Sequence, residues 1–350
     1  MTSPFTSTLP APSLPVHSTA DLLARVVGLD APRRLVWREE TLGSRPRSGT
    51  VLCQTLVSAI SPGTELGAYI GLPPLRDSTG YPRVQGYCNV ARVIAVGEGV
   101  EVLSVGDRVL SFTSHRSHFE LAAADVLLRL EAEMDAGRIA CTYLFHLGYE
   151  AVLRAGVRAG SRVLVIGLGA LGLAAVALAA RAGATVSALT AHARPAKSAR
   201  ALGAQQVLAR GDTAALAALQ ADVVITTTSA WADWDIALGA AARRSFIAVL
   251  GFPGRGEPPP AGNPLDARQF YSKQLRIEAV GMAPELPDSR GLLRFNERDN
   301  LHWLAHEIHV GRLAADVLIS GRLPAADIER AYAALLARDG SPITYLLDWT

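Results

Sequence analysis

Two patterns of hydrophobic and polar positions follow one another along the chain of 350 residues. Up to about Asp125, short apolar or alternating stretches separated by Gly and Asp turns predict strands, including 34–37, 50–59 and 89–96. From Ala140 onwards, apolar runs of four to six residues alternate with Ala-rich stretches that favour helices. This alternation predicts right-handed crossovers and a parallel sheet that is covered on both faces.

The apolar runs of the second part predict the strands of that sheet. They lie at 162–166, 185–189, 223–226, 246–250 and 275–280. Residues 1–31 are expected to form a tail with one short helix at 19–27. The last fifty residues are expected to form a helix, a strand at 315–319, a helix at 325–338 and a final strand.

The change of pattern divides the chain into two domains, which is also what its length suggests. One domain is expected to be β-rich, and the other is expected to be a doubly wound α/β domain. With 49% hydrophobic and 19% charged residues, the composition excludes a mostly disordered chain.

The charge and the cysteine content limit the cellular compartment and the kinds of binding partner that we expect. The net charge of +2 gives no electrostatic reason to expect nucleic acid or an anionic membrane as a partner. The three cysteines lie far apart, which excludes a four-cysteine zinc loop and fits a reducing, cytoplasmic compartment. Residues 1–21 contain no Lys or Arg, so the basic start of a secretory signal is missing.

One uncharged stretch, 163–180, is nearly long enough to span a bilayer. It contains three glycines at the spacing of a turn, and Arg162 and Arg181 flank it. We therefore expect a buried strand followed by a buried helix rather than a membrane span.

The same stretch carries a glycine motif, since residues 162–172 have the sequence RVLVIGLGALG. The motif follows an apolar strand and opens an Ala-rich helix, which is the setting in which such glycines bind a dinucleotide. Gly167 would allow the tight turn, Gly169 the approach of the pyrophosphate, and Gly172 the packing of the helix on the strand. The amides of the helix start, at Ala170 and Leu171, would face the phosphates. The alternative is a glycine-rich turn that binds nothing.

The end of the next strand indicates which dinucleotide is bound. An NAD site has an acid about 20 residues after the glycines, whereas this chain has Thr190 and no acid. His192, Arg194 and Lys197 follow, and an arginine with a hydroxyl would bind the 2′-phosphate that a carboxylate would repel. We therefore predict NADPH in preference to NADH. The alternative is that Arg194 and Lys197 form only the solvated first turn of a helix.

Several motifs resemble, in order and spacing, those of the medium-chain alcohol dehydrogenase/reductase superfamily, from about Arg33 to the end of the chain. The matching segments are ISPGTE at 60–65, GYPRVQG at 80–86, VGEGV at 96–100, VGDRV at 105–109, VLVIGLGALG at 163–172, LGA at 202–204 and ITYLLDW at 343–349. The resemblance implies a GroES-like β-rich catalytic domain, formed by 32–155 and 297–350, and a Rossmann domain at 156–296, with the active site in the cleft between them. It also implies a small carbonyl or alcohol substrate, and we expect a homodimer.

The positions that hold the catalytic zinc in this family differ in this chain. Pro62 stands at the first ligand position, Tyr87 replaces a histidine ligand, and Tyr143 stands at the third position. Proline cannot bind zinc, and a neutral tyrosine is a poor ligand. The segment 107–118 is also too short for the structural zinc loop of the family. The resemblance is therefore to a zinc-lacking branch, and we expect no bound metal.

Without zinc, reduction of a carbonyl needs a hydroxyl or an imidazole that stabilises the developing alkoxide and delivers a proton. Thr64 lies where family members place a relay hydroxyl, Tyr87 and Tyr143 replace metal ligands, and His146 shares a helix face with Tyr143. These four are the candidate catalytic residues, with Glu65 as a candidate support behind them. For each ring, the alternative is a purely structural role.

Three further features are expected to be structural. Cys88 is expected to be a small buried residue rather than a nucleophile. His302 and His306 have the i,i+4 spacing of metal ligands, but the order H-E-x-x-H is absent, which favours an amphipathic helix. The segment 253–264, rich in Pro and Gly, is expected to be a loop near the cleft.

These observations favour a metal-independent, NADPH-dependent oxidoreductase that interconverts a ketone or aldehyde and an alcohol. Thr227 and Gly251, at the ends of two later strands, complete the expected cofactor site. Reduction of a C=C bond on the same scaffold is one alternative, and a cofactor-binding protein without turnover is the other. A role in secondary metabolism is expected, although the sequence does not identify the substrate.

Overall fold

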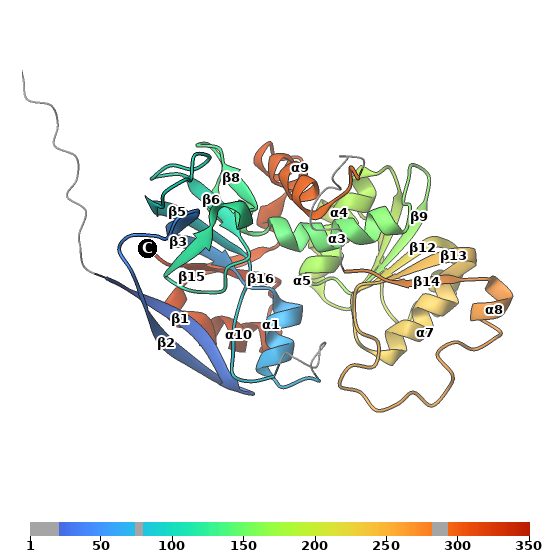
Figure 1. Ribbon diagram of the computed structural model, residues 1–350. Helices are drawn as coiled ribbons and strands as arrows, with labels where there is room; N and C mark the ends of the chain where they lie inside the picture. Colours follow the sequence, from blue (N-terminus) through green and yellow to red (C-terminus); the bar gives the residue numbers. More distant parts are fainter. Residues whose placement is uncertain (1–20, 74–79, 282–292) are drawn as a thin grey trace, which may run out of the picture.

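The computed structural model describes residues 21–73, 80–281 and 293–350. They form two parts that lie side by side, one rich in antiparallel strands and one with a parallel sheet between helices (Figure 1). The predicted α/β fold class is therefore confirmed.

The β-rich part is organised around a seven-stranded sheet in the order β15-β16-β3-β5-β6-β8, with β7 paired to β3. Its strands are β3 (Thr50–Ala59), β5 (Asn89–Val96), β6 (Arg108–Ser111), β7 (His118–Ala122), β8 (Leu128–Leu130), β15 (Ile319–Pro324) and β16 (Thr344–Asp348). Strands β3 and β5 have the predicted bounds. Strand β16 pairs antiparallel with β3, with Leu347 opposite Ser58, so the last strand completes a sheet that begins near the start of the chain.

A second, three-stranded sheet corrects the prediction for the start of the chain. Its strands are β2 (Arg34–Leu42), β1 (Leu22–Ala31) and β4 (Arg83–Val84), with β1 in the middle. The predicted helix at 19–27 is therefore wrong over its described residues, and residues 19 and 20 lie outside them. Val26, Val27 and Gly28 are poor helix formers, and pairing on both sides of β1 satisfies its backbone groups instead.

The parallel sheet has six strands in the order β11-β10-β9-β12-β13-β14, which is the order 3-2-1-4-5-6 of a Rossmann sheet. The strands are β9 (Arg162–Ile166), β10 (Thr185–Leu189), β11 (Gln206–Leu208), β12 (Ala221–Thr226), β13 (Ala241–Val249) and β14 (Arg276–Ala279). All five predicted strands are present. The prediction missed the short β11 and placed the start of β13 too late.

Helices cover both faces of this sheet. They are α4 (Ala170–Arg181), α5 (Ala193–Ala201), α6 (Thr213–Ala218), α7 (Trp231–Ala240) and α8 (Phe270–Lys273). Successive residues of a strand point to opposite faces. Accordingly, Val163 and Val165 of β9 belong to the core cluster that contains α4, whereas Leu164 and Ile166 belong to the cluster that contains α7.

The remaining helices lie in the β-rich part or between the two parts. They are α1 (Pro62–Tyr69), α2 (Ala136–Ala140), α3 (Thr142–Arg154), α9 (Glu297–His309) and α10 (Ile328–Ala337). The strand predicted at 315–319 is wrong at its start, because Ala315–Val317 form a 3₁₀ turn and β15 begins at Ile319. Ala315 and Leu318 are both buried, and their spacing of three residues fits such a turn better than the alternation of a strand.

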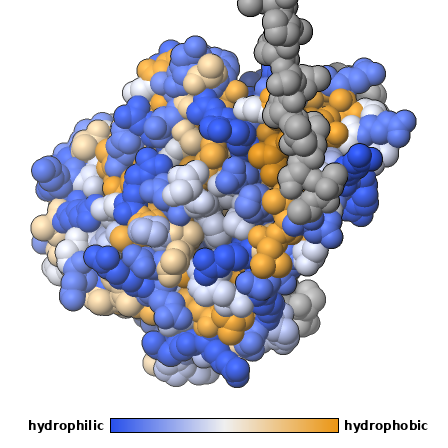
Figure 2. Space-filling view, turned by 90° about the vertical axis from the view of Figure 1, so that its left-hand side faces the viewer, coloured by the Kyte–Doolittle hydropathy of each residue, from blue (hydrophilic) through white to orange (hydrophobic). Residues whose placement is uncertain are grey.

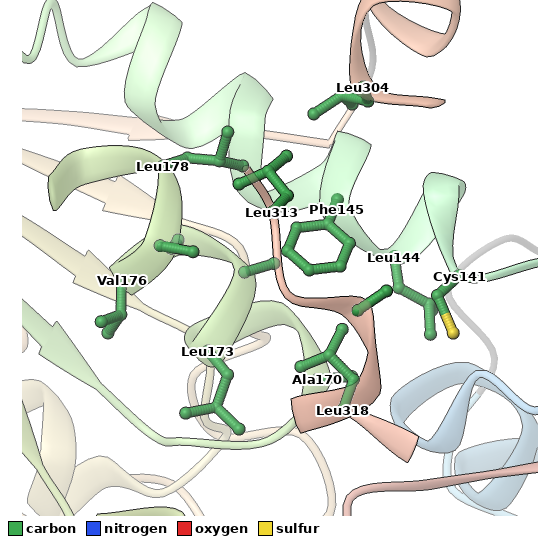
Figure 3. Close-up of a cluster of buried hydrophobic side chains, with 14 of the residues drawn as sticks. Cys141, Leu144, Phe145, Ala170, Leu173, Val176, Leu178, Leu304, Leu313 and Leu318 are labelled. Atoms are coloured by element: carbon green, nitrogen blue, oxygen red, sulfur yellow. The ribbon is translucent and has the colours of Figure 1, made fainter. Parts of the chain in front are cut away.

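The hydrophobic core is continuous between the two parts because α3 packs along α4. Figure 3 shows Phe145 of α3 in one cluster with Leu173 of α4, Leu304 of α9 and Leu313. All four side chains are almost completely buried. Since interiors of this kind are close-packed, α3 holds its own residues in a fixed position relative to the glycine motif at the start of α4.

No helix within the described residues is long and apolar enough to cross a membrane. The uncharged stretch 163–180 contains β9 and α4, as predicted. On the face of the molecule drawn in Figure 2, hydrophilic residues predominate and hydrophobic residues form separate patches.

Candidate active site

The glycine motif forms the turn between β9 and α4. Gly167 has a φ of 88°, in the left-handed region that favours glycine. A Cβ on Gly172 would lie 1.8 Å from the carbonyl oxygen of Gly167, so this close approach requires glycine. A Cβ on Gly169 would meet nothing within 4 Å, so the backbone there is open. With Ala170 and Leu171 at the helix start, the turn has the geometry that a pyrophosphate site needs.

Thr227 and Gly251 lie beside this turn. The Thr227 hydroxyl donates a hydrogen bond to the carbonyl oxygen of Gly167 over 3.0 Å. A Cβ on Gly251 would lie 2.1 Å from the carbonyl oxygen of Thr228, so the loops after β12 and β13 are in contact. Ligands of open α/β sheets bind where the strand order reverses, which is here between β9 and β12. The structure therefore brings both predicted residues to the expected end of the sheet.

The residues predicted to select the cofactor lie at the end of β10 and the start of α5. The backbone N–H of His192 donates to the Thr190 hydroxyl over 3.2 Å, which fixes the turn between the two elements. His192, Arg194 and Lys197 are exposed. Within the described part of the chain, neither Arg194 nor Lys197 forms an ion pair. Both cations therefore remain available to a phosphate group.

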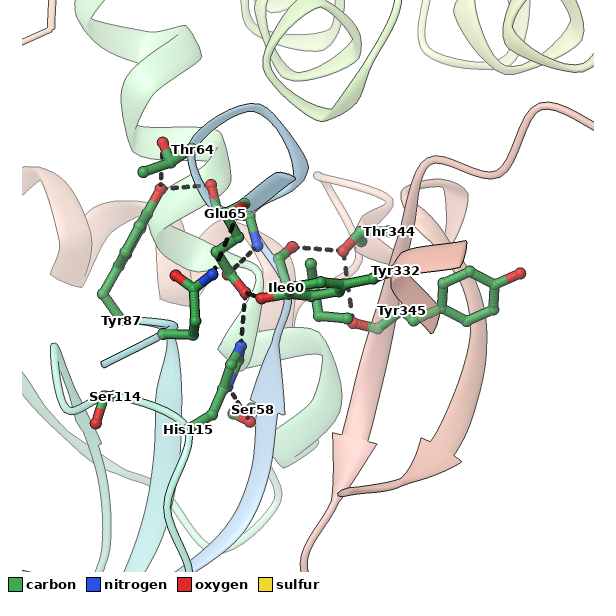
Figure 4. Close-up of polar contacts among 12 residues, drawn as sticks. Ser58, Ile60, Thr64, Glu65, Tyr87, Ser114, His115, Tyr332, Thr344 and Tyr345 are labelled. Atoms are coloured by element: carbon green, nitrogen blue, oxygen red, sulfur yellow. Dashed lines mark hydrogen bonds and ion pairs between the residues drawn. The ribbon is translucent and has the colours of Figure 1, made fainter. Parts of the chain in front are cut away.

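Tyr87 forms the centre of the predicted catalytic group. Its hydroxyl donates to the hydroxyl of Ser61, and it lies 3.4 Å from the hydroxyl oxygen of Thr64 (Figure 4). Ser61 is the residue that precedes α1, a position where a serine side chain usually caps the helix. Here the Ser61 side chain makes no such cap and contacts Tyr87 instead. The sequence prediction missed Ser61, although its place next to the relay motif was a usable signal.

Burial is the main influence on the Tyr87 phenol. It raises the pKa of Tyr87, and the neighbouring Cys88 adds to the rise, while the hydrogen bonds with Ser61 and Thr64 oppose it. The phenol is therefore protonated at neutral pH and can act as a proton donor. The two neighbouring hydroxyls are placed to stabilise the phenolate that would remain.

The other two candidates continue the same cluster through aromatic contacts. The ring of Tyr143 meets that of Tyr87 edge to face, with 5.5 Å between centroids. The ring of His146 stacks on Tyr143 at 5.5 Å, and Phe112, which the prediction missed, packs against Tyr143 at 4.7 Å. The structure thus brings all four predicted residues into one contiguous group that begins at Thr64.

His146 is the most deeply buried member of this group. Its ring is buried, and neither ring nitrogen has a hydrogen-bond partner. The nearest carboxylate oxygen, on Glu150, lies 3.7 Å from Nε2, which is too long for a hydrogen bond. Burial lowers the pKa of His146 to about 4. At neutral pH the ring is therefore uncharged, and it is a weaker candidate for a proton donor than Tyr87.

The low pKa of His146 predicts a pH dependence of stability. Between about pH 6.5 and pH 4, the unfolded chain binds a proton at His146 that the folded chain does not, so the free energy of unfolding falls as the pH falls. A shift of this size corresponds to roughly 3 kcal/mol. His146→Leu removes the group and is expected to lose less stability than the wild type between pH 7 and pH 4. Urea unfolding at the two pH values measures this difference.

The exposed His306 on α9 provides the control variant, since His306→Leu makes the same substitution outside the buried cluster. If His146→Leu and the wild type lost the same stability on acidification, the ring would not be a buried, uncharged group.

A buried polar network lies behind Tyr87 and holds the start of α1. Figure 4 shows Glu65 at its centre. One carboxylate oxygen accepts from the backbone N–H of Ser61 over 2.6 Å, and the other accepts from the Tyr332 hydroxyl over 2.6 Å and contacts Nε2 of His115 at 2.9 Å. On the far side of its ring, Nδ1 of His115 contacts the Ser58 hydroxyl at 2.8 Å. Glu65 therefore joins the start of α1 to His115 and Tyr332, two partners that the prediction missed.

Glycine at position 86 makes room for this network. Gly86 has a φ of 86°, and a Cβ there would lie 2.5 Å from the His115 ring. Any side chain at this position would displace the ring that contacts Glu65. The residue that precedes Tyr87 thus helps to keep the buried ring in place.

The residues present at the family's metal position do not fit zinc. Among residues 21–73, 80–281 and 293–350, no group of three or more His, Cys, Asp or Glu side chains comes together in a way that could hold an ion. Pro62, Tyr87 and Tyr143 occupy the three ligand positions of the resemblance. Cys88 is buried, as predicted, and burial raises the pKa of its thiol well above the usual range.

The two histidines with the i,i+4 spacing of metal ligands lie on an amphipathic helix, as predicted. His302 and His306 lie on the exposed side of α9 (Glu297–His309), which buries Leu301 and Leu304 on its other side. This is an amphipathic helix of the expected kind.

Comparison with known proteins agrees with this architecture. Residues 170–295 match the family model of zinc-binding dehydrogenases. The matched segment belongs to the nucleotide-binding part and includes none of positions 62, 87 and 143. No curated protein matches the sequence.

Solved structures with the same fold cover nearly the whole chain. They include 2R,3R-butanediol dehydrogenase from Bacillus subtilis, with 18% identity and a TM-score of 0.76 over 93% of this chain and 99% of that one. L-idonate 5-dehydrogenase from Escherichia coli has 16% identity and a TM-score of 0.78 over 94% and 99%. A candidate zinc-binding dehydrogenase from Sinorhizobium meliloti, bound to NADP, has 17% identity and a TM-score of 0.75 over 93% and 99%.

The chain thus has the fold of the medium-chain dehydrogenase/reductase enzymes, with a GroES-like part and a Rossmann part. This fold is the one that the sequence motifs predicted.

Proposed function

We propose that this protein is an NADPH-dependent oxidoreductase that interconverts a ketone or aldehyde and an alcohol without a metal ion. The observation that carries the proposal is a cluster of three hydroxyl groups beside the start of α1, from Tyr87, Ser61 and Thr64. It occupies the catalytic part of a dehydrogenase fold and offers a proton where zinc members of the family offer a metal. The glycine turn and the NADP-bound relative support a nicotinamide cofactor.

When bound, NADPH supplies the hydride. The residues of the chain stabilise the negative charge that hydride transfer creates on the substrate oxygen. The substrate oxygen becomes an alkoxide, which takes the phenol proton of Tyr87. Ser61 and Thr64 then stabilise the phenolate by hydrogen bonds, which are strongest toward a charged acceptor. Glu65 holds the backbone of Ser61, at the start of α1, by accepting a hydrogen bond from its N–H.

Stopped-flow oxidation of bound NADPH across a panel of ketones, aldehydes and enones tests this function. Consumption of saturated carbonyls supports the proposal, whereas consumption of enones alone would favour reduction of C=C bonds. Tight binding of NADPH without oxidation by any member of the panel would favour a protein without turnover. The cytoplasmic setting, the homodimer, the domain boundaries and the place in secondary metabolism stay predictions.

The preference for NADPH rests on Arg194. A hydrogen bond between charged groups contributes roughly 1.5–3 kcal/mol, so Arg194→Ala is expected to weaken NADPH binding about tenfold or more. NADH binding should barely change. Arg200, at the end of the same helix α5, provides the matched control, since Arg200→Ala should bind NADPH like the wild type. Fluorescence titration of the three proteins with each nucleotide measures these affinities. Tighter binding of NADH than of NADPH by the wild type would contradict the assignment.

The purified protein is expected to hold no stoichiometric zinc. The reason is that Pro62, Tyr87 and Tyr143 supply no good ligand at the family's metal position. Elemental analysis after gel filtration measures the metal content. One tightly bound zinc per chain would overturn this expectation, and its loss together with activity on treatment with a chelator would assign the metal a role in the reaction.

A further inference from the structure

Two arginines from different parts of the molecule lie beside α1. Tyr81 and Gln85, on either side of Arg83, donate to the carbonyl oxygens of Ala68 and Glu65 in α1, and Arg255 contacts Gly67 of the same helix. Arg83 belongs to β4 of the β-rich part, and Arg255 lies in the loop after β13 of the nucleotide-binding part. Figure 1 shows α1 on the side of the β-rich part that faces the parallel sheet. Arg255 reaches across, because its Nε donates to the carbonyl oxygen of Pro73 over 2.9 Å.

The guanidinium of Arg255 lies next to the proposed proton donors. A Cβ on Gly67 would be 3.1 Å from Nη1 of Arg255, so the guanidinium rests on this residue of α1. Gly67 follows Thr64 by three residues, and residues at this spacing are neighbours on one face of a helix. The residue that Arg255 contacts and the residue that carries the Thr64 hydroxyl are therefore neighbours on α1.

Among residues 21–73, 80–281 and 293–350, the two positive charges have no carboxylate within ion-pair distance. Within the same residues, Nε of Arg83 is buried without a hydrogen-bond partner. Burial lowers the pKa of Arg255, and the charge of Arg83 lowers it further, while Tyr81 opposes the change. Two neighbouring guanidiniums without a carboxylate cost free energy unless an anion joins them.

We propose that Arg255 and Arg83 bind an oxyanion of the substrate, a carboxylate or a phosphate group located a few bonds from the carbonyl. The inference rests on the proposed function and adds the substrate class to it. Guanidinium groups present a planar fork of donors that matches both kinds of oxyanion, and pairs of this type are strong because both partners are charged. An uncharged ketone would leave the two arginines without a partner. The anionic group would also orient the carbonyl toward Tyr87.

Calorimetric titration of the full chain saturated with NADP⁺ tests the inference, with malonate and inorganic phosphate as probes and malonamide as the neutral control. The wild type is expected to bind one malonate or one phosphate per chain and no malonamide, and the two probes distinguish the carboxylate from the phosphate. Arg255→Gln is expected to weaken this binding at least tenfold, and Arg83→Gln to act in the same direction. Arg268 is exposed and paired with Asp266, so Arg268→Gln is the matched control and should bind like the wild type.

Several results would overturn the inference. One is the absence of anion binding by the wild type, and another is equal binding by wild type and Arg255→Gln. A third is a fall in NADP⁺ affinity in Arg255→Gln, since the arginine would then serve the cofactor. Arg255→Gln decides the question alone if Arg83→Gln fails to fold, because Arg255 is on a surface loop. Repeating the titration without NADP⁺, together with a titration with NADP⁺ itself, separates the two proposals. Arginine-dependent anion binding by a protein that binds no dinucleotide would refute the proposed function and show an anion site that is not part of a dehydrogenase active site.

Discussion

Gly172→Val is expected to lower the affinity for NADPH by at least about a hundredfold. A Cβ at this position would lie 1.8 Å from the carbonyl oxygen of Gly167, and no real side chain tolerates such a contact. The start of α4 must therefore move away from β9, which displaces the amides that face the phosphates. Overpacking of this kind also costs about 1–3 kcal/mol of stability. Fluorescence titration with NADPH and urea unfolding measure the two effects.

Two other glycines give this experiment its controls. Gly239→Ala on α7 meets nothing within 4 Å, so it should leave the NADPH affinity unchanged. Because alanine favours a helix more than glycine does, it should not lower the stability and is expected to raise it by about 0.5–1 kcal/mol. Gly169→Ala also meets nothing within 4 Å, so it should preserve the stability of the free protein. It is expected to weaken NADPH binding, because the pyrophosphate approaches the backbone there. Normal NADPH affinity in Gly172→Val would show that the turn is not the cofactor site.

Tyr87→Phe is expected to lower kcat about a hundredfold, within the range of 10² to 10⁴ that the loss of a positioned proton donor typically costs. The change removes only the hydroxyl that contacts Ser61 and Thr64, and it keeps the ring that packs on Tyr143. NADPH affinity should therefore stay near the wild-type value. Tyr143→Phe, which keeps the same ring contacts, is expected to lower kcat at least tenfold if its hydroxyl shares the proton path.

Single-turnover oxidation of NADPH gives the rate of the chemical step without product release. Tyr271→Phe, at an exposed position of α8, is the matched control and should keep the wild-type rate. Wild-type rates in both Tyr87→Phe and Tyr143→Phe would show that the two rings only shape the site. Proton delivery would then fall to Thr64, His146 or water.

The nucleotide-binding part could be predicted closely because its signals are local. Strands β9 and β10 are short apolar runs bounded by turns, and the glycine motif links a strand to a helix within a few residues. The catalytic cluster could be predicted in part for a related reason, since Thr64, Tyr87 and Tyr143 each stand at a recognisable position of a family motif.

The rest depends on contacts between distant segments, which the sequence does not reveal. Glu65 meets His115 over a separation of 50 residues and Tyr332 over a separation of 267 residues. Nothing near either partner indicates that it binds a carboxylate. Strand β1 was missed for a different reason. Its main partner is the neighbouring strand β2, with which it pairs from Leu22 opposite Leu42 to Ala31 opposite Arg34, whereas only two of its residues pair with β4. Strand pairing, together with residues that are poor helix formers, decides its conformation.

The pairing of β16 with β3 affects the order in which the two parts of the protein fold during synthesis. Residues near the C-terminal end of the chain brace the segment before α1: Thr344 donates to the carbonyl oxygen of Ile60 over 2.5 Å, and Trp349 donates to the Ser58 hydroxyl over 2.9 Å. The intervening Rossmann part can fold while these residues are still in the ribosome, because its sheet uses no strand from either end. The cofactor site would thus be complete before the catalytic site, and a nascent chain would bind dinucleotide before it could turn over substrate.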